Sequence, residues 1–476
     1  MDAETFRALG HQLVDWVAEY WERVESLPVQ SELAPGDISA MLPESAPEEP
    51  EDWSAILADL ERVIVPGTTH WQHPGFFAYF PANVSGPSVL GELVSAGLGA
   101  QGMLWQTSPA MTELETRVLD WMAQLLGLSP AFRSDAPGGM GGGVIQGTAS
   151  EATLVSMLAA RSRHDVPLAK LRVYASEQTH SSAVKAAMIA GLATGPDDDR
   201  QVRQIPVDEQ FRMRPEALAA AIRSDREAGA VPIWVCATVG TTGTCAVDPV
   251  SAVADVIASE APDAWLHVDG AFAGVLALCP EHRHLFEGVD RADSVVVNAH
   301  KWLLTNFDCS LFWSRDRASL LRALSITPEY LRNAATESGS VIDYRDWQIP
   351  LGRRFRSMKL WFVLRHYGAS GLRTFLRQHI ALAGDFAARV DAHPGLERVA
   401  PVHTSLVCFR AVEGNEASRA LLEAVNASGE VYLTHTTVPD GRGGQHFVLR
   451  LAIGGVRTTA AHVDLAWARI VASLRR

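Results

Sequence analysis

The sequence predicts an α/β protein whose main domain is a mostly parallel β-sheet covered by helices on both faces. Short apolar runs, typical of strands buried on both sides, recur through the middle of the chain. Segments with helical periodicity lie between these runs, as the crossovers between parallel strands require. A long helical region followed by two short strands, near the C-terminus, predicts an additional small α+β domain.

The expected strands are short and rich in β-branched and aromatic residues. They cover residues 171–176 (LRVYAS), 231–239 (VPIWVCATV), 264–269 (AWLHVD) and 294–300 (SVVVNAH). Helices are expected at 215–229 and 248–261. In such sheets ligands bind beyond the carboxyl ends of the strands, so polar residues at those ends are the candidates for function.

The N-terminal part reads as an arm and not as a compact domain. Residues 1–26 have helical periodicity, 42–53 are rich in proline and acid, and helical periodicity returns from Trp53. The apolar face of such an arm can be buried against a partner subunit. We therefore expect an arm over 1–84, a large domain over 85–358 and a small domain over 359–476.

Composition limits the classes of protein that fit. The chain has 476 residues, of which 47% are hydrophobic and 20% charged, and its net charge of −14 disfavours binding to nucleic acid. It has no run near the ~18 apolar residues of a membrane span. The acidic N-terminus, MDAETFRALG, does not resemble a signal peptide, so a cytoplasmic location is expected. Five cysteines without a CxxC pair predict free buried thiols, and no metal is expected.

A glycine-rich turn, GGGVIQGTASEATL (141–154), is the first chemical feature. Thr148, Ala149 and Ser150 follow Gly147 and open a helix, and a helix N-terminus of this kind can bind an anion. The stretch lacks the Gly-Lys-Ser/Thr of a nucleotide P-loop and is not a GxGxxG motif. Taken alone it is also compatible with an ordinary helix cap.

Three further polar residues follow predicted strands. Asp269 ends an apolar strand, where its carboxylate needs a cationic partner or serves as a helix cap. His180 follows a strand and is also compatible with an ordinary loop histidine. Lys301 lies near a strand end in the stretch NAHKWLL. Together with the anion site they fit pyridoxal 5′-phosphate, which needs a Schiff-base lysine, an acid for its pyridine nitrogen, a phosphate cradle and a group against its ring. Burial would lower the pKa of Lys301 and make it a better nucleophile.

Long stretches of the chain resemble the group II pyridoxal-phosphate decarboxylases, most closely the aromatic L-amino-acid decarboxylases. The matching stretches are HWQHPGFFAYFP (70–81), SPAMTELE (108–115), GGGVIQGTASEATL, WLHVDGAFAG, NAHKWLLTNFDCS and DYRDWQIPLGRRFRSMKLWFV (343–363). The resemblance covers nearly the whole chain. It implies the type I fold of the aspartate aminotransferases, with a seven-stranded sheet, and a homodimer with active sites at its interface.

The resemblance also implies a role for each residue. Lys301 would hold the cofactor as a Schiff base, Asp269 would pair with the pyridine nitrogen, and His180 would stack on the ring. Ala271 would pack on the opposite face of the ring. The phosphate and its surroundings would be held by Thr148, Ala149, Ser150, Thr242, Asn298 and His300. Tyr330, in the polar loop 325–344, matches the family tyrosine that protonates Cα after CO₂ has left.

A substrate pocket is implied in the same way, partly supplied by the partner subunit. The matching positions are Trp71, Tyr79, Phe80, Pro81, Ala82, Gln101, Met103, Phe307 and Gly352. Several of them depart from relatives: Ala82 stands where animal relatives often have threonine, and Gln101 and Met103 replace more apolar or aromatic residues. Gly352 matches a position where plant relatives with glycine favour indoles and those with serine favour phenols.

The expected reaction is decarboxylation of an aromatic L-amino acid, such as tryptophan, 5-hydroxytryptophan, DOPA, tyrosine or phenylalanine, to its amine. The presence of both Tyr330 and His180 favours plain decarboxylation over an aromatic aldehyde synthase, in which one of the two is changed. Histidine decarboxylase is a further alternative, which Gly352 disfavours. A catalytically idle dimer or binding protein on the same fold is the remaining alternative.

Overall fold

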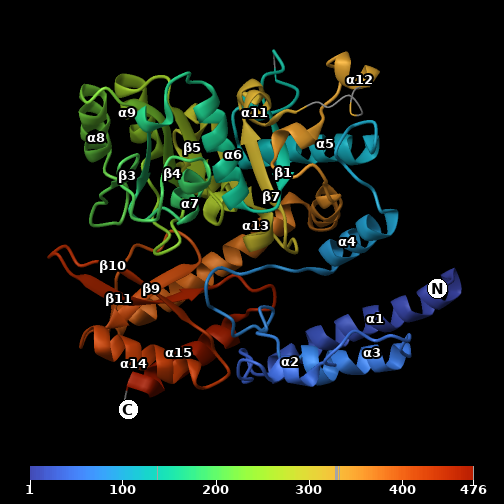
Figure 1. Cartoon of the computed structure of the whole chain (residues 1–476). Helices are drawn as coiled ribbons and strands as arrows, with labels where there is room; N and C mark the ends of the chain where they lie inside the picture. The colour runs from blue at the N-terminus through green and yellow to red at the C-terminus, as the bar shows by residue number, and fades with distance from the viewer. Residues whose placement is uncertain (137, 327–330, 332, 475–476) are drawn as a thin grey trace.

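The structure is a computed structural model, and it describes residues 1–136, 138–326, 331 and 333–474. Its two β-sheets lie in different parts of the molecule (Figure 1). The larger has seven strands in the order β1-β7-β6-β5-β4-β2-β3, and the smaller has four in the order β10-β11-β9-β8. The predicted α/β class and the predicted mostly parallel sheet are confirmed, because only β7 of the larger sheet runs against its neighbours.

The strands of the larger sheet are short and almost entirely buried. They are β1 (Gly142–Gln146), β2 (Leu171–Ser176), β3 (Val202–Ile205), β4 (Val231–Thr238), β5 (Trp265–Asp269), β6 (Ser294–Asn298) and β7 (Ser310–Ser314). Burial on both faces explains why they read as continuous apolar runs and not as alternating patterns. All four strands expected from the sequence are present.

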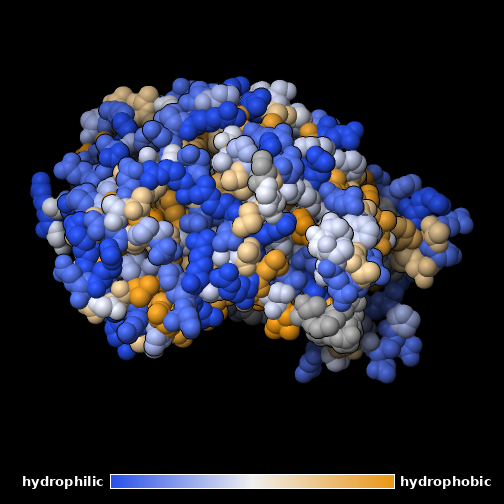
Figure 2. All heavy atoms as spheres, turned by 90° about the horizontal axis from the view of Figure 1, so that it is seen from above, coloured by the Kyte–Doolittle hydropathy of each residue, from blue (hydrophilic) through white to orange (hydrophobic). Residues whose placement is uncertain are grey.

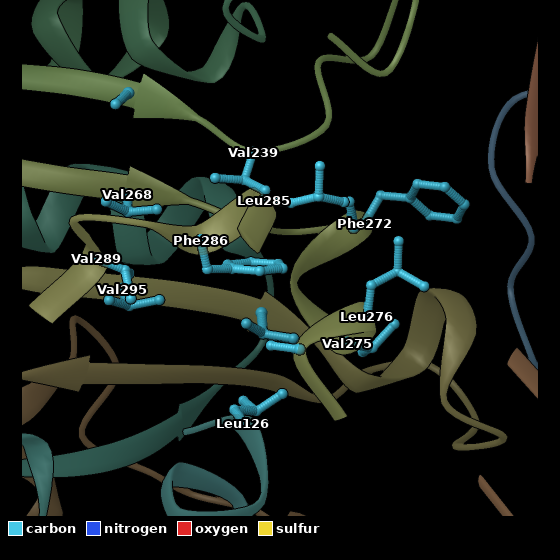
Figure 3. Packing of buried hydrophobic residues seen from close by; sticks show 14 of the residues in the cluster. Leu126, Val239, Val268, Phe272, Val275, Leu276, Leu285, Phe286, Val289 and Val295 are labelled. Carbon is cyan, nitrogen blue, oxygen red and sulfur yellow. The ribbon is translucent and has the colours of Figure 1, made fainter. Parts of the chain in front are cut away.

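Helices cover both faces of this sheet. One face packs on α6 (Ala149–Ser162), α7 (Ser182–Ile189) and α11 (Arg317–Leu324). The other packs on α5 (Pro109–Leu126), α8 (Pro215–Glu227) and α9 (Val250–Glu260). Figure 3 shows part of the second layer, where Val268 and Val295 of neighbouring strands pack near Phe286.

The smaller sheet is antiparallel and belongs to the C-terminal part of the chain. Its strands are β8 (Leu396–Arg398), β9 (Leu406–Ala411), β10 (Thr434–Pro439) and β11 (Gln445–Ala452). Helices α14 (Asn415–Asn426) and α15 (Ala460–Leu474) complete this part. The long helix α13 (Arg356–Ala392), with a non-helical Gly368, runs between the two sheets (Figure 1). Because α13 spans the expected boundary at 358, that boundary stays a prediction.

The N-terminal helices lie apart from the larger sheet (Figure 1). They are α1 (Ala3–Arg23), α2 (Asp37–Met41) and α3 (Trp53–Asp59), followed by α4 (Gly86–Leu98). Arg23 and Trp16 of α1 both bond to Glu61, which holds α1 beside the segment that follows α3. Among the residues described, none in α1 or α3 is buried. Packing of this arm on a partner subunit stays a prediction.

Three details differ from the sequence-based expectation. The strand expected over 294–300 ends at Asn298, and the short helix α10 (Ala299–Trp302) follows, so Lys301 lies in a helical turn beyond the strand. Within the glycine-rich stretch, residues 142–146 form strand β1, because β7 pairs with them along their whole length. The remaining described helix, α12 (Ala334–Glu337), lies in the loop expected over 325–344.

The surface and the cysteines agree with the composition. Figure 2 shows a face on which most side chains are hydrophilic and apolar ones gather in small patches. Among the residues described, no helix combines the length and apolarity needed to cross a membrane. All five cysteines are buried and free, as predicted.

Candidate active site

The predicted polar residues gather beyond the carboxyl ends of neighbouring parallel strands. Strand β5 ends at Asp269, β6 ends at Asn298, and the two strands pair in parallel with Asp269 opposite Val296. Helix α10 follows β6 directly and carries His300 and Lys301. This placement follows from the sheet: parallel strands bring their carboxyl ends to the same edge.

The chain has four lysines, and Lys301 differs from the other three. Lys170 and Lys185 are exposed, and Lys359 is buried with its Nζ 3.0 Å from Glu92. Lys301 is partly accessible, and its Nζ lies 5.4 Å from the centre of the Phe80 ring. Burial lowers the pKa of its amine, while the Asp269 carboxylate opposes that shift. The Lys301 amine therefore loses its proton more easily than an exposed lysine does, which makes it a better nucleophile.

His180 and Asp269 lie close enough to Lys301 for their charges to interact. Burial lowers the pKa of His180; Asp269 opposes that shift and Lys301 reinforces it. Asp269 is buried, and its Oδ1 accepts a hydrogen bond of 2.9 Å from the amide of Ala271. A buried carboxylate with one oxygen bonded to its own chain keeps the second oxygen for a cationic partner.

The turn before α6 places the residues of the expected anion site at a helix N-terminus. Thr148 is the N-cap of α6, and its side chain accepts a bond from the amide of Glu151. The amides of Ala149 and Ser150 are in the first turn, so they have no acceptor within their own helix. Ser150 is exposed, and so is Thr242 on the loop after β4. The helix N-terminus thus offers amides and hydroxyls to an anion.

Asn298 and His300 are held in place by the strand that pairs with β6. Asn298 Oδ1 accepts a bond from the Ser310 hydroxyl, and His300 Nδ1 accepts one of 2.9 Å from the amide of Cys309. Burial, reinforced by the charge of nearby Lys301, lowers the pKa of His300 to about 4. His300 is therefore a neutral imidazole at physiological pH, with Nε2 as its remaining polar atom.

A stack of aromatic rings lies beneath Lys301. Phe80 stacks on Phe272 with ring centroids 3.8 Å apart, and Phe272 stacks on Trp302 at 4.9 Å. Trp302 is fully buried and donates a 3.0 Å bond to His379. Trp302 has a packing role, and Phe80 brings an aromatic surface to the amine.

Three of the predicted pocket residues are exposed aromatic side chains near this edge. Trp71 stacks on Tyr79 with centroids 5.7 Å apart, and the two are 38% and 50% exposed. Phe307, 59% exposed, packs edge-on against His300 at 4.6 Å. Pro81 is buried, and the carbonyl of Ala82 accepts a bond from Gln72. Exposed aromatic groups beside a reactive amine suit an aromatic ligand.

Gln101, Met103 and Gly352 form a second group. Gln101 Oε1 accepts bonds from the amides of Met103 (2.9 Å) and Arg353 (3.2 Å). Its Nε2 lies 3.6 Å from the position that a Cβ would take on Gly352. The three residues therefore lie on one surface. Helix α4 ends shortly before Gln101, and it carries an exposed apolar face of its own.

Comparison with known proteins agrees with this geometry. The model of the pyridoxal-dependent decarboxylase conserved domain matches residues 35–412. The chain is 47% identical to tyrosine decarboxylase 2 of Narcissus pseudonarcissus, covering 98% of this chain and 93% of that one. It is 48% identical to phenylacetaldehyde synthase of Arabidopsis thaliana, covering 98% and 95%. The crystal structure of Oryza sativa TDC with PLP and tryptamine matches with a TM-score of 0.94 and 41% identity, covering 100% and 98%.

The chain belongs to the pyridoxal-dependent decarboxylase family. Its fold is that of the type I pyridoxal-phosphate enzymes, and its cofactor is pyridoxal 5′-phosphate (PLP). The residues fit the cofactor: Lys301 has a lowered pKa, Asp269 is buried with a free oxygen, and the α6 N-terminus suits a phosphate group. The chain is thus a decarboxylase, a lyase that removes CO₂.

Sequence reasoning missed one buried cation of this decarboxylase site. Arg450 of β11 is buried and donates to the carbonyls of Gly243 (3.0 Å) and Tyr79 (3.2 Å). Its guanidinium lies 5.2 Å from the Phe80 ring, on which Lys301 also lies, and its charge lowers the pKa of Lys301. An arginine inside the apolar run HFVLRLAI was the available signal, because charges are rarely buried in strands without a purpose.

The predicted proton donor, Tyr330, lies outside the described residues. The segments on either side of it are described: α11 ends at Leu324, and α12 begins at Ala334. Asp343 holds α12, since its Oδ2 accepts a 2.6 Å bond from Thr336 while its Oδ1 accepts one of 2.8 Å from the Trp105 amide. The role of Tyr330 stays a prediction.

Proposed function

We propose that this decarboxylase converts aromatic L-amino acids to arylalkylamines and CO₂. The observation that carries the proposal is a nucleophilic Lys301, beside Asp269 and His180, at an edge lined by the exposed rings of Trp71, Tyr79 and Phe307. Flat apolar surfaces near the reacting centre select aromatic side chains. The relatives include a tyrosine decarboxylase and a phenylacetaldehyde synthase, and the solved structure holds tryptamine. All three compounds are aromatic, which agrees with an aromatic substrate.

Each residue has a proposed task. Lys301 would hold the cofactor through its Nζ. When bound, PLP draws electrons away from the bond that breaks at the substrate Cα. Asp269 keeps a proton on the pyridine nitrogen, which preserves that electron-withdrawing power. His180 and Ala271 would lie against the two faces of the ring. The phosphate would be held by Thr148, Ala149, Ser150, Thr242, Asn298 and His300.

The product depends on the step after CO₂ departs. Tyr330, assisted by His180, is proposed to place a proton on Cα, which completes amine formation. An aldehyde synthase would leave Cα without this proton; oxygen would then be reduced to hydrogen peroxide, and water would release the aldehyde and ammonia. Because both Tyr330 and His180 are present in the sequence, plain decarboxylation is the proposed outcome.

A homodimer is part of the same proposal. Helix α4 exposes Leu90, Leu93, Val94 and Leu98, four apolar side chains on a helix that leads directly into Gln101. Trp361 and Phe362 of α13 line a groove against α4. Covering this face by a second copy would bury it and would bring Gln101, Met103 and Gly352 toward the partner's site.

Product analysis over a panel of amino acids tests the proposed function. The purified enzyme is incubated with PLP and L-tryptophan, L-tyrosine, L-DOPA, L-phenylalanine, L-histidine or L-glutamate, and amine, aldehyde and peroxide are quantified. The proposal expects arylalkylamine in equal amounts with CO₂. Aldehyde with peroxide would favour the synthase alternative, and histamine alone the histidine decarboxylase. Absence of any product, despite cofactor loading, would favour an idle binding protein.

A further inference from the structure

The carboxylate of Asp308 lies where three segments of the site meet. Its Oδ1 accepts a 3.1 Å bond from Arg356 Nε, and its Oδ2 accepts a 3.0 Å bond from an Arg356 terminal nitrogen. One guanidinium therefore holds both oxygens, which fixes the geometry of the pair in two directions. Arg356 is the first residue of α13, so the pair ties this helix to the segment between α10 and β7.

The same carboxylate lies beside the turn that precedes the expected anion site. A Cβ added at Gly147 would lie 3.2 Å from Asp308 Oδ2 and 3.9 Å from Arg356. Gly147 also donates a 3.2 Å bond to Glu151 in the first turn of α6. The Gly147 turn is thus bonded to the carboxylate of Glu151 and lies against that of Asp308, and its position sets that of Thr148, the N-cap.

The chain neighbours of Asp308 hold His300. The amide of Cys309 donates to His300 Nδ1, and the Phe307 ring packs edge-on against the same imidazole. A displacement of Asp308 would therefore move the imidazole as well as the Gly147 turn. The imidazole and the Gly147 turn belong to two different segments of the chain, and both are part of the expected phosphate site.

We infer that Asp308, through its paired bonds with Arg356, is a positioning residue for the phosphate group of the cofactor. This inference rests on the proposed function in one respect: it requires that the α6 N-terminus and His300 hold that phosphate. Neither Asp308 nor Arg356 is assigned a contact with the cofactor. Their task is to keep the two phosphate-binding segments at the right separation.

The charges around Asp308 make its ionised form the relevant one. Burial raises the pKa of Asp308, but the bonds and charge of Arg356 and the charge of Lys359 outweigh this, so the pKa lies below its usual value. Arg354 is also nearby, 3.7 Å from Oδ1. Asp308→Asn therefore removes a full charge and one of two acceptors while preserving shape.

Binding of PLP to the cofactor-free enzyme tests the inference. Asp308→Asn and Arg356→Lys are each titrated with PLP and with pyridoxal, which lacks the phosphate. Lysine keeps the charge but loses the two-pronged geometry. Both variants should bind PLP roughly tenfold more weakly than the wild type but should bind pyridoxal as the wild type does. The double variant should lose little more PLP affinity than either single variant.

Arg377→Lys provides the matched control. Arg377 is on the same helix and holds both oxygens of Glu281, at 2.6 and 3.0 Å, but on an exposed surface. It should leave PLP binding within about twofold of the wild type. Thermal unfolding of the cofactor-free forms is measured in parallel, and Arg356→Lys serves if Asp308→Asn does not fold.

Two outcomes would overturn the inference. One is PLP affinity within twofold of the wild type in both site variants. The other is an equal loss for PLP and pyridoxal, which a general structural role would produce. Failure of the wild type itself to bind PLP would instead count against the proposed function, so the two failures are distinguishable.

Discussion

Glu115 and Arg353 form a fully buried ion pair that also bonds to the backbone of Ile145 in the edge strand β1. An Arg353 terminal nitrogen lies 2.5 Å from Glu115 Oε1 and donates a 3.1 Å bond to the carbonyl of Ile145, while the Ile145 amide donates to the same Glu115 oxygen at 2.8 Å. Strand β1 is an edge strand, and the pair satisfies its backbone where no further strand does.

Breaking this pair should destabilise the fold strongly. Glu115→Ala leaves a buried guanidinium without its counter-charge, and we expect a loss of about 3–5 kcal/mol in the free energy of unfolding. Glu281→Ala, which removes the exposed partner of Arg377, should cost about 1 kcal/mol or less. Urea unfolding at one fixed protein concentration measures both. A loss below 1 kcal/mol in Glu115→Ala would contradict the assigned role of the pair.

Acid should unfold the enzyme through its buried histidines. Burial lowers the pKa of His267, His300 and His379 to about 4, against 6.5 as the usual value. Below 6.5 these histidines take up protons only on unfolding, so stability falls as the pH drops from about 6.5 to about 4. Asp248, with a pKa raised by burial to about 6, takes up its proton in the folded state and opposes the trend. The three histidines together outweigh the single aspartate, so the free energy of unfolding falls over this pH range.

His379→Gln provides a test of this pH dependence. Glutamine can still accept the bond from Trp302 but does not titrate. Between pH 6 and 4.5 the stability of this variant should fall less steeply than that of the wild type, by at most about 1.4 kcal/mol per pH unit. Unfolding free energies at several pH values measure the slope. An unchanged slope would contradict the assignment of His379 as a neutral buried group.

Substitution of Gly352 should shift the preference between ring sizes. A serine there would place its Cβ 3.6 Å from Gln101 Nε2 and narrow the space beside it. We expect Gly352→Ser to lower kcat/KM for tryptophan relative to tyrosine roughly tenfold, the usual effect of one small group in a pocket. Gly10→Ser of α1, which has open space around it, is the control. Gly339→Ser would not serve, because a φ of +69° would strain a serine there. An unchanged ratio would place Gly352 outside the pocket.

Charging the exposed face of α4 should break the proposed dimer. Leu93 is 51% exposed on α4, and Leu93→Glu would place a charge within an interface of two copies. Ile189→Glu, at an equally apolar position that is 61% exposed at the end of α7, serves as the control. Sedimentation should show a monomer for the first and a dimer for the second. A Leu93→Glu dimer of wild-type strength would rule out this face.

Removal of the Tyr330 hydroxyl should separate cofactor binding from amine formation. Tyr330→Phe is expected to bind PLP normally but to lose amine production by a factor of 10²–10⁴, the usual contribution of a positioned proton donor. Aldehyde and peroxide would take the place of the amine. Both are measured with the same substrate panel. Normal amine turnover in Tyr330→Phe would contradict its role as the proton donor.

Much of the fold could be predicted because buried parallel strands leave a local signal. Strand β2 has the residues expected for it, Leu171 to Ser176, since a continuous apolar run ends where the chain turns. Strand β1 was not expected, because its sequence, GGVIQ, reads as a glycine-rich turn. Its strand conformation comes from pairing with β7, about 170 residues later, and no local pattern reports such a partner.

The candidate site shows the same division. Asp269 and Lys301 were predictable because each follows an apolar run and parallel strands end at one edge. The Asp308–Arg356 pair and the contact of Gln101 with Gly352 were not, because they join segments that only tertiary packing brings together. Arg450 lies in the smaller sheet, and its approach to Phe80 depends on how the two sheets meet.

The position of the cofactor on the chain tests the account most directly. The enzyme is loaded with PLP, reduced with borohydride so that the Schiff base becomes a stable secondary amine, digested and mapped by mass spectrometry. Only four lysines compete. We expect the phosphopyridoxyl group on Lys301, in the peptide containing NAHKWLL, and no amine production by Lys301→Ala. Label on Lys170, Lys185 or Lys359 instead, or full activity in Lys301→Ala, would contradict it.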